Sequence, residues 1–125
     1  MNLNQVTIYS KKPVETVEFF ELLGLKRIVD SLPRYARLEC PDGESTLSVH
    51  VDDDATENRT VVLYFECADL DAKTVQLRSA GLEFDEDPKD RSWLWREAYL
   101  KDPNGNRICL FYAADNRKSP PWRVK

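Results

Sequence analysis

Two side chains in this sequence are suited to acid–base or nucleophilic chemistry. His50 is the only histidine, and imidazole changes charge near neutral pH, so His50 is the first candidate for a general base. A solvated or hydrogen-bonded histidine at a strand end is the alternative. Cys109 is the candidate nucleophile, but the sequence shows no basic neighbour that would activate it, which favours a buried, inert thiol. The sequence also supports no Ser–His–Asp triad, because it has a single histidine and no nucleophile-elbow motif.

The usual sequence signatures of metal and disulfide chemistry are missing. The cysteines, Cys40, Cys67 and Cys109, are far apart and form no Cys-x-x-Cys pair, which argues against a disulfide framework or a structural zinc site. This cysteine usage favours a reducing cytoplasm. Residues 52–54 are all aspartate, but no calcium-loop spacing follows them, so we expect a solvated linker end.

The segment 91–99, Arg-Ser-Trp-Leu-Trp-Arg-Glu-Ala-Tyr, is unusually aromatic. Aromatic walls suit a planar or apolar ligand. The segment equally suits a subunit interface, because Trp, Tyr and Arg are enriched in such interfaces. A bulge in this strand would change the direction in which its side chains point. The sequence therefore leaves open both the role of the segment and the facing of Trp95, Glu97 and Tyr99.

The elements that position these residues come from a repeated unit. Residues 6–25 read as a strand, polar residues, an amphipathic helix and a Gly-Leu stop, and residues 63–82 repeat that order. The Asp-Gly pair at 42–43 has its counterpart in the Asn-Gly pair at 104–105, and both pairs favour hairpin turns. The sequence therefore predicts an α+β fold of two βαβββ modules.

The predicted boundaries make the chain, 1–125, a single domain. The modules span 4–51 and 60–113, with a polar acidic linker at 52–59 and an extended C-terminal tail at 114–125. Helices are expected at 13–23 and 70–80, with Ser10 and Asp69 as their caps. Strands are expected at 6–10, 26–30, 34–40, 45–51, 63–67, 83–86, 93–101 and 107–112.

Strand alternation predicts which side chains a ligand would meet. In each module one face of the sheet packs on the helix, and two such modules can turn their remaining faces toward each other to enclose a cup. The residues assigned to this cup are Gln5, Thr7, Ser48, His50, Tyr64, Cys109 and Phe111. Apolar walls with a few neutral polar groups suit a neutral or weakly acidic, partly aromatic small molecule.

Composition and charge exclude several classes of partner. The chain has 42% hydrophobic and 32% charged residues, which is ordinary for a globular domain. Its net charge of −4 argues against a polyanion-binding surface, so we expect no nucleic-acid partner. No apolar stretch approaches the roughly 18–20 residues of a membrane span, and the N-terminus lacks a signal-peptide pattern. We therefore expect a cytoplasmic protein without a membrane partner.

The duplicated module and two short motifs resemble a known family. The helix exit Leu-Leu-Gly-Leu at 22–25 and the motif Asp-Pro-Asn-Gly-Asn at 102–106, followed by an apolar strand, are similar to those of the vicinal-oxygen-chelate superfamily of glyoxalases, bleomycin-resistance proteins and dioxygenases. The resemblance covers residues 4–113. It implies two modules that pair into a curved sheet around a cup. It also implies a homodimer, because family members commonly complete their cups across subunits.

Metal-dependent members of this superfamily take four ligands, usually His, Gln or Glu, from the first and last strand of each module. The resemblance carries these positions to Gln5, Ser48, Val62 and Cys109. Val62 has no donor atom, serine is a poor neutral ligand, and the family's sites favour oxygen and nitrogen over sulfur. His50 has the expected facing but lies two residues, about 6.8 Å, beyond the ligand position. We therefore expect no bound metal and no cofactor.

Three functions are compatible with the sequence. The leading interpretation is a metal-free small-molecule-binding protein, similar to the bleomycin-resistance members. The alternative is a metal-dependent lyase, isomerase or dioxygenase with altered ligands, and the third is an interaction module whose cup is a packed core. An enzyme of this family should present a nearly complete set of strong ligands, which this sequence does not. The sequence identifies neither the ligand nor a reaction, and the fold alone does not supply one.

Overall fold

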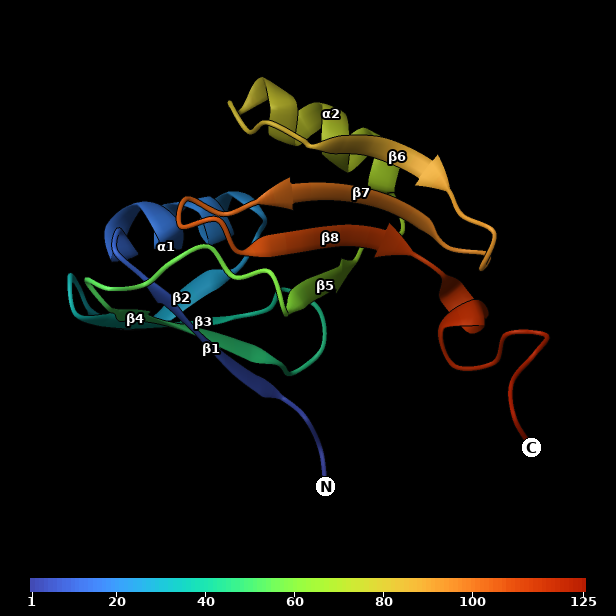
Figure 1. Cartoon of the computed structure of the whole chain (residues 1–125), viewed down its shortest axis with the longest axis horizontal. Coiled ribbons are helices and arrows are strands. Elements are labelled where there is room, and N and C mark those ends of the chain that lie inside the picture. Colours follow the sequence, from blue (N-terminus) through green and yellow to red (C-terminus); the bar gives the residue numbers. More distant parts are fainter. The chain divides into compact units, whose positions relative to one another are not determined.

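The computed structural model describes all 125 residues, which form two compact units. The first unit consists of residues 1–58 and 102–106, and the second of residues 59–101 and 107–125. Each unit holds one α-helix and one curved four-stranded sheet (Figure 1). The predicted α+β fold with two βαβββ modules is confirmed.

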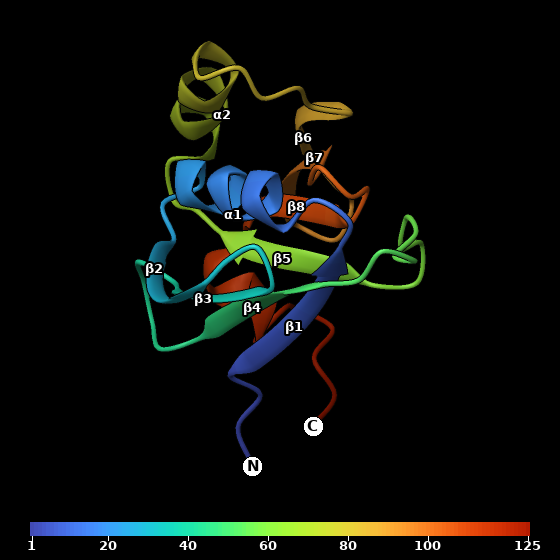
Figure 2. The ribbon, with the colours of Figure 1, turned by 90° about the vertical axis from the view of Figure 1, so that its left-hand side faces the viewer.

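The first unit is a sheet with a helix on one face. Its strands are β1 (Gln5–Ser10), β2 (Lys26–Ser31), β3 (Tyr35–Glu39) and β4 (Thr46–Val51), and its helix is α1 (Pro13–Leu22). The strand order is β1-β4-β3-β2, in which β1 and β4 are parallel and the other neighbours are antiparallel. Helix α1 contacts all four strands from one side (Figure 2). The opposite face carries no helix of this unit, and we call it the first open face.

Local sequence explains where α1 begins and ends. Pro13 occupies the first helical position, where its fixed φ is favourable and its missing N–H costs nothing. The predicted cap is wrong, because Lys12 holds the cap position and the Ser10 hydroxyl instead accepts the Lys12 N–H at 2.8 Å. The Ser10 hydroxyl also hydrogen-bonds to Thr16 inside the unit. Gly24, at φ +105°, ends the helix in the left-handed conformation that glycine tolerates.

The second unit repeats this arrangement. Its elements are β5 (Val62–Glu66), α2 (Leu70–Ser79), β6 (Glu86–Asp90), β7 (Arg96–Lys101) and β8 (Arg107–Tyr112). The strand order is β5-β8-β7-β6, again with the first and last strands of the module parallel. Alternate residues of β7 and β8 are buried on the helix side, namely Ala98, Leu100, Ile108 and Leu110. We call the face without the helix the second open face.

The strand predicted at 83–86 is wrong in position. Strand β6 occupies residues 86–90 instead and reads Glu-Asp-Pro-Lys-Asp. It lies at the edge of the sheet and pairs only with β7, and charged residues and proline are typical of such edge strands. The apolar pattern that predicted a strand, around Leu82 and Phe84, ends before β6 begins. Backbone pairing rather than side-chain alternation therefore defines this strand.

The segments flanking β7 and β8 also differ from the expected strands. Residues 91–95 form the turn between β6 and β7, with Leu94 at φ +68°, so β7 begins at Arg96 rather than at Trp93. The C-terminal tail begins with a short 3-10 helix, Ala114–Arg117, and adds no strand. Both α-helices have ten residues, about half of a membrane span, and neither has the length and apolarity to cross a bilayer.

The turn between β7 and β8 is built around the buried carboxylate of Asp102. Its Oδ1 accepts the backbone N–H groups of Asn104 at 2.9 Å and Asn106 at 2.8 Å, and its Oδ2 accepts the Asn106 side-chain amide at 2.8 Å. Gly105 adopts φ +84° and donates its N–H to the Asp102 carbonyl at 2.9 Å. The Asn104 side chain accepts the Lys11 N–H at 3.0 Å. The Asp-Pro-Asn-Gly-Asn motif is therefore a structural turn in this chain.

Candidate functional site

Four predicted site residues lie on the first open face: Gln5, Thr7, Ser48 and His50. Thr7 is paired with Ser48 across the parallel β1–β4 ladder, and Gln5 Nε2 donates to Ser48 Oγ at 2.8 Å. His50 is exposed, and its Nδ1 lies 2.8 Å from the Val51 carbonyl. His50 thus has the geometry of a hydrogen-bonded histidine at a strand end, which was the alternative to a general base.

A hydrogen-bonded network extends from Ser48 along β3. The Tyr35 hydroxyl lies 2.7 Å from Ser48 Oγ, and Arg37 Nε donates to the Tyr35 hydroxyl at 3.0 Å. The hydrogen bond from Ser48 and, to a smaller extent, the Arg37 hydrogen bond and charge lower the pKa of Tyr35. Sequence reasoning missed Tyr35 and Arg37. Alternation around the buried residues Ala36 and Leu38 was the signal that could have placed them on this face.

The other three predicted site residues lie on the second open face, where aromatic rings gather. Tyr64 is paired with Cys109 across β5 and β8, and its ring contacts Phe111 edge-on, with centroids 5.7 Å apart. Trp95 stacks on Phe111 at 4.6 Å and an angle of 17°, and meets Tyr64 edge-on at 6.0 Å. We call Tyr64, Trp95 and Phe111 the aromatic cluster. Its rings hold one another in favourable stacked and edge-to-face geometries.

The structure decides the facing that the sequence left open. In the unbroken β7–β8 ladder, Glu97 is paired with Phe111 and Tyr99 with Cys109, so all four side chains share the second open face. Trp95 joins them through its stacking on Phe111. The aromatic segment therefore contributes Trp95, Glu97 and Tyr99 to the second open face.

The remaining part of that segment is exposed at the β6–β7 turn. Trp93 and Leu94 are 45% and 47% exposed, which is high for side chains of this size and apolarity. These are the side chains of the segment that are available for a contact between subunits. The homodimer implied by the family resemblance stays a prediction.

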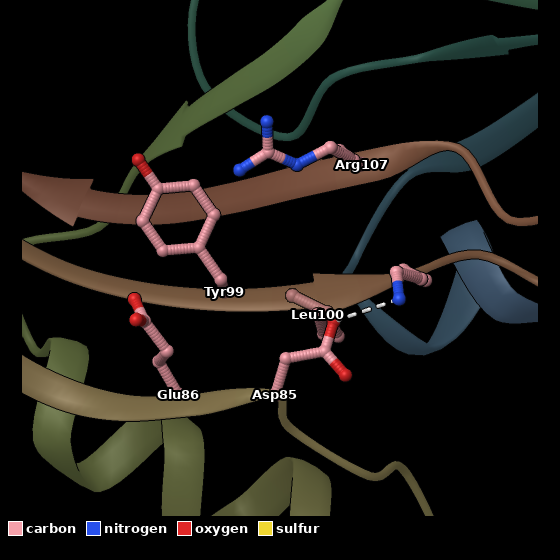
Figure 3. Close-up of a pocket in the computed structure, with 6 residues that line it drawn as sticks. Asp85, Glu86, Tyr99, Leu100 and Arg107 are labelled. Atoms are coloured by element: carbon pink, nitrogen blue, oxygen red, sulfur yellow. Dashed lines mark ion pairs between the residues drawn. The ribbon is translucent and has the colours of Figure 1, made fainter. Parts of the chain in front are cut away.

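A pocket of about 450 Å³ lies on the second unit (Figure 3). It is lined by Asp85, Glu86, Tyr99, Leu100, Lys101 and Arg107. The Arg107 guanidinium lies over the Tyr99 ring, 5.5 Å from its centroid, and Lys101 Nζ lies 3.8 Å from Asp85 Oδ2. Because Tyr99 belongs to the second open face, this pocket and the aromatic cluster share one surface.

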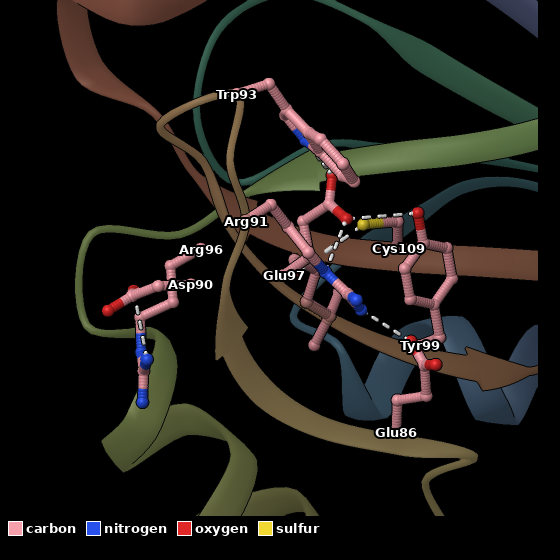
Figure 4. Close-up of polar contacts among 9 residues, drawn as sticks. Glu86, Asp90, Arg91, Trp93, Arg96, Glu97, Tyr99 and Cys109 are labelled. Carbon is pink, nitrogen blue, oxygen red and sulfur yellow. Dashed lines mark hydrogen bonds and ion pairs between the residues drawn. The ribbon is translucent and has the colours of Figure 1, made fainter.

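Glu97 is the polar centre of that surface, at only 2% exposure (Figure 4). Its carboxylate accepts Trp93 Nε1 at 3.1 Å and the Tyr99 hydroxyl at 3.3 Å. Arg91 lies with its Nε 3.2 Å from Glu97 Oε1, and its other end donates to Glu86 at 2.6 Å. Sequence reasoning had left Glu97 unassigned, because nothing in the local pattern connects it to Arg91 and Trp93.

Burial changes the acidity of the groups around Glu97. Burial raises the pKa of Cys109 to about 12, and the nearby Glu97 charge adds to the increase. Burial also raises the pKa of Tyr99, and the neighbouring Tyr64 hydroxyl adds to the increase. At neutral pH both groups are therefore protonated. Cys109 is an inert thiol rather than a nucleophilic thiolate.

The residues at the family's metal-ligand positions do not fit a metal. In the first unit, the Gln5 amide and the Ser48 hydroxyl hydrogen-bond to each other and to neighbouring side chains. In the second unit, Val62 packs on a buried apolar cluster that includes Cys109, whose thiol is protonated. No group of three or more His, Cys, Asp or Glu side chains is arranged to hold a metal ion. In neither unit are these side chains free to act as a strong oxygen or nitrogen donor set.

We expect purified protein to contain no stoichiometric Zn, Ni, Fe or Mn, measured by elemental analysis. A metal present at 100 times its Kd would stabilise the fold by about 2.7 kcal/mol. Thermal unfolding should therefore give the same Tm with each divalent metal and with chelator. A Tm that rises by several degrees with one metal and falls with chelator would show that these residues do form a site.

Comparisons with known proteins agree with the fold. A model of the Glyoxalase/Bleomycin resistance protein/Dioxygenase superfamily matches residues 2–110. No curated protein is detectably similar to the chain in sequence.

Several solved structures share the fold at low sequence identity. A glyoxalase/bleomycin resistance protein/dioxygenase from Nocardioides aligns with a TM-score of 0.78 and 22% identity, over 100% of this chain and 90% of that chain. A glyoxalase/bleomycin resistance protein/dioxygenase family enzyme from Burkholderia phytofirmans PsJN aligns with a TM-score of 0.76 and 19% identity, over 90% of this chain and 99% of that chain. A lactoylglutathione lyase from Agrobacterium tumefaciens aligns with a TM-score of 0.73 and 12% identity, over 89% of this chain and 92% of that chain. At these identities the likeness extends to the fold alone.

Proposed function

Because this chain belongs to the Glyoxalase/Bleomycin resistance protein/Dioxygenase superfamily and lacks a donor set that fits a metal, we propose that it binds a small, partly aromatic molecule without one. The observation that carries this proposal is the second open face, where the aromatic cluster and the 450 Å³ pocket share Tyr99 as a neighbour. Ligand sites typically combine apolar walls with a few polar groups in this way.

Exposure and packing indicate which ring meets the ligand. Tyr64 is 48% exposed, so one side of its ring is available for stacking. Phe111 is buried and stacked on Trp95, and both rings contact Tyr64 edge-on and so support it. A planar ligand ring placed against Tyr64 would gain stacking without disturbing that support.

The polar groups favour binding over covalent chemistry. Cys109 is buried and protonated, and Glu97 already accepts hydrogen bonds from Trp93 and Tyr99. Neither group is poised to attack a substrate or to remove a proton from one. Glu97, fixed by its hydrogen bonds with Trp93 and Tyr99, instead preorganises a surface for recognition.

Tyr64→Ala is expected to weaken the binding of neutral aromatic fragments by about 1–3 kcal/mol, the contribution of a buried ring face. A saturation-transfer NMR screen of such fragments identifies binders, and titration of the wild type and the variant measures the loss. Tyr112→Ala is the matched control, because Tyr112 is 43% exposed and alternates to the opposite face of β8 from Phe111. Its affinity should equal that of the wild type.

The proposal fails if Tyr64→Ala and Tyr112→Ala have the same effect on every fragment. It also fails if the bound fragments shift only amide signals of residues on the helix side of the sheet. In either case the second open face would be a packed surface, and an interaction module would become the better interpretation.

A further inference from the structure

We propose that the pocket beside the aromatic cluster holds the carboxylate of an aromatic acid, with Arg107 as its counter-ion. The inference rests on the proposed function and adds the chemical class of the ligand. The ion pairs around the pocket, the charges of its lining and its continuity with the aromatic cluster support this assignment.

Arg107 is the cation of this pocket that lacks an anionic partner. It is the first residue of β8 and alternates with Cys109, so it lies on the second open face. Its guanidinium contacts the Tyr99 ring and forms no ion pair. The neighbouring cations are engaged, since Lys101 pairs with Asp85, and Arg91 pairs with two glutamates. The guanidinium donors of Arg107 are thus available to a ligand.

The chemistry of the lining favours a carboxylate over other anions. A guanidinium presents a planar fork of donors that matches the two oxygens of a carboxylate or phosphate. Two acids, Asp85 and Glu86, and two bases, Lys101 and Arg107, line the pocket, so a single negative charge meets no net repulsion. A phosphate dianion would bring twice that charge close to both acids. A monoanionic carboxylate is therefore the better match.

The position of Tyr99 connects the carboxylate subsite to the aromatic cluster. Its ring lines the pocket under Arg107 and packs against the buried cluster that contains Phe111, against which Trp95 also packs. One ligand can thus place its carboxylate at Arg107 and its ring against Tyr64. A volume of about 450 Å³ is within the usual range for small-molecule sites, about 300–1,000 Å³.

The test compares two acids, benzoate and phenylacetate, with their neutral amides, benzamide and phenylacetamide. Titrations of the isotope-labelled full-length protein, followed by amide chemical shifts, give the four affinities. We expect each acid to bind about tenfold or more tightly than its amide, because a charge-assisted bidentate contact is lost in the amide. In Arg107→Gln this preference should disappear while the affinity for the amides stays the same.

Arg34→Gln is the matched control, since it removes the same charge from an exposed arginine of the first unit and should leave all four affinities unchanged. Circular dichroism verifies that both variants are folded. If acids and amides bind equally, and Arg107→Gln changes neither, the carboxylate subsite is overturned while the proposed function stands. If none of the four compounds binds at Tyr64, both proposals fail. Inorganic phosphate that competes more strongly than benzoate would also overturn the choice of a carboxylate.

Discussion

Replacing Gly105 with valine should lower the free energy of unfolding by roughly 1–3 kcal/mol, which chemical denaturation followed by circular dichroism measures. Gly105 adopts φ +84° in the β7–β8 turn, a conformation that a β-branched residue tolerates poorly. An added Cβ would also lie 3.0 Å from Glu57 Cγ and 3.1 Å from Glu57 Cβ. Backbone strain and this close contact add, so we expect the cost to fall in the upper part of that range.

Gly43→Val separates the two contributions. Gly43 has a similar backbone angle, φ +74°, but an added Cβ there would meet no atom within 4 Å. Gly43→Val therefore measures the strain alone, and the excess cost of Gly105→Val measures the contact with Glu57. Equal costs would mean that Glu57 moves aside freely. A neutral effect at Gly105 would contradict the turn conformation itself.

Glu97→Ala should destabilise the fold by about 2–4 kcal/mol, because it removes the acceptor of several buried or partly buried donors. Trp93 Nε1 and the Tyr99 hydroxyl would lose their hydrogen bonds, and Arg91 would lose its buried partner. Leaving such donors without an acceptor costs more than the hydrogen bonds contribute, since the groups cannot regain water where they lie. Chemical denaturation of the variant and the wild type measures the difference.

Glu97→Gln is the matched comparison, because glutamine keeps the shape and one acceptor oxygen but removes the charge. We expect it to cost clearly less than Glu97→Ala. Equal costs for the two variants would indicate that the ion pair with Arg91, rather than the hydrogen bonds of Trp93 and Tyr99, dominates. If Glu97→Ala were neutral, the region around Glu97 would have to be open to water, and its role as the polar centre of the second open face would be wrong.

Several features of the fold follow from the sequence alone, because they depend on neighbours along the chain. The Gly-Leu stops at 24–25 and 81–82 and the apolar spacing before them define both helices, and the structure places α1 and α2 there. The apolar strand 107–112 was predicted with the boundaries that β8 has. These signals are local, since helical periodicity, strand alternation and a glycine stop act within one element.

Alternation also placed Tyr64, Cys109 and Phe111 on one face of the second sheet, and Gln5, Thr7, Ser48 and His50 on one face of the first. Their role in binding a ligand stays a prediction. Alternation identifies the face on which a side chain lies, but it does not identify the partner that the side chain meets there.

Those partners were decided by the tertiary structure, for physical reasons. Strand β6 has no apolar alternation to predict it, because an edge strand is held by backbone hydrogen bonds to β7 rather than by burial. The facing of Glu97 and Tyr99 depended on an unbroken ladder with β8, which no local pattern reveals. The pairing of Arg91 with Glu97 brings together a turn and a strand, and it leaves Arg107 as the unpaired cation beside Tyr99. The sequence by itself thus determined the family, the two βαβββ modules and the face on which each of these side chains lies, whereas the tertiary structure decided which charged and aromatic side chains meet on those faces.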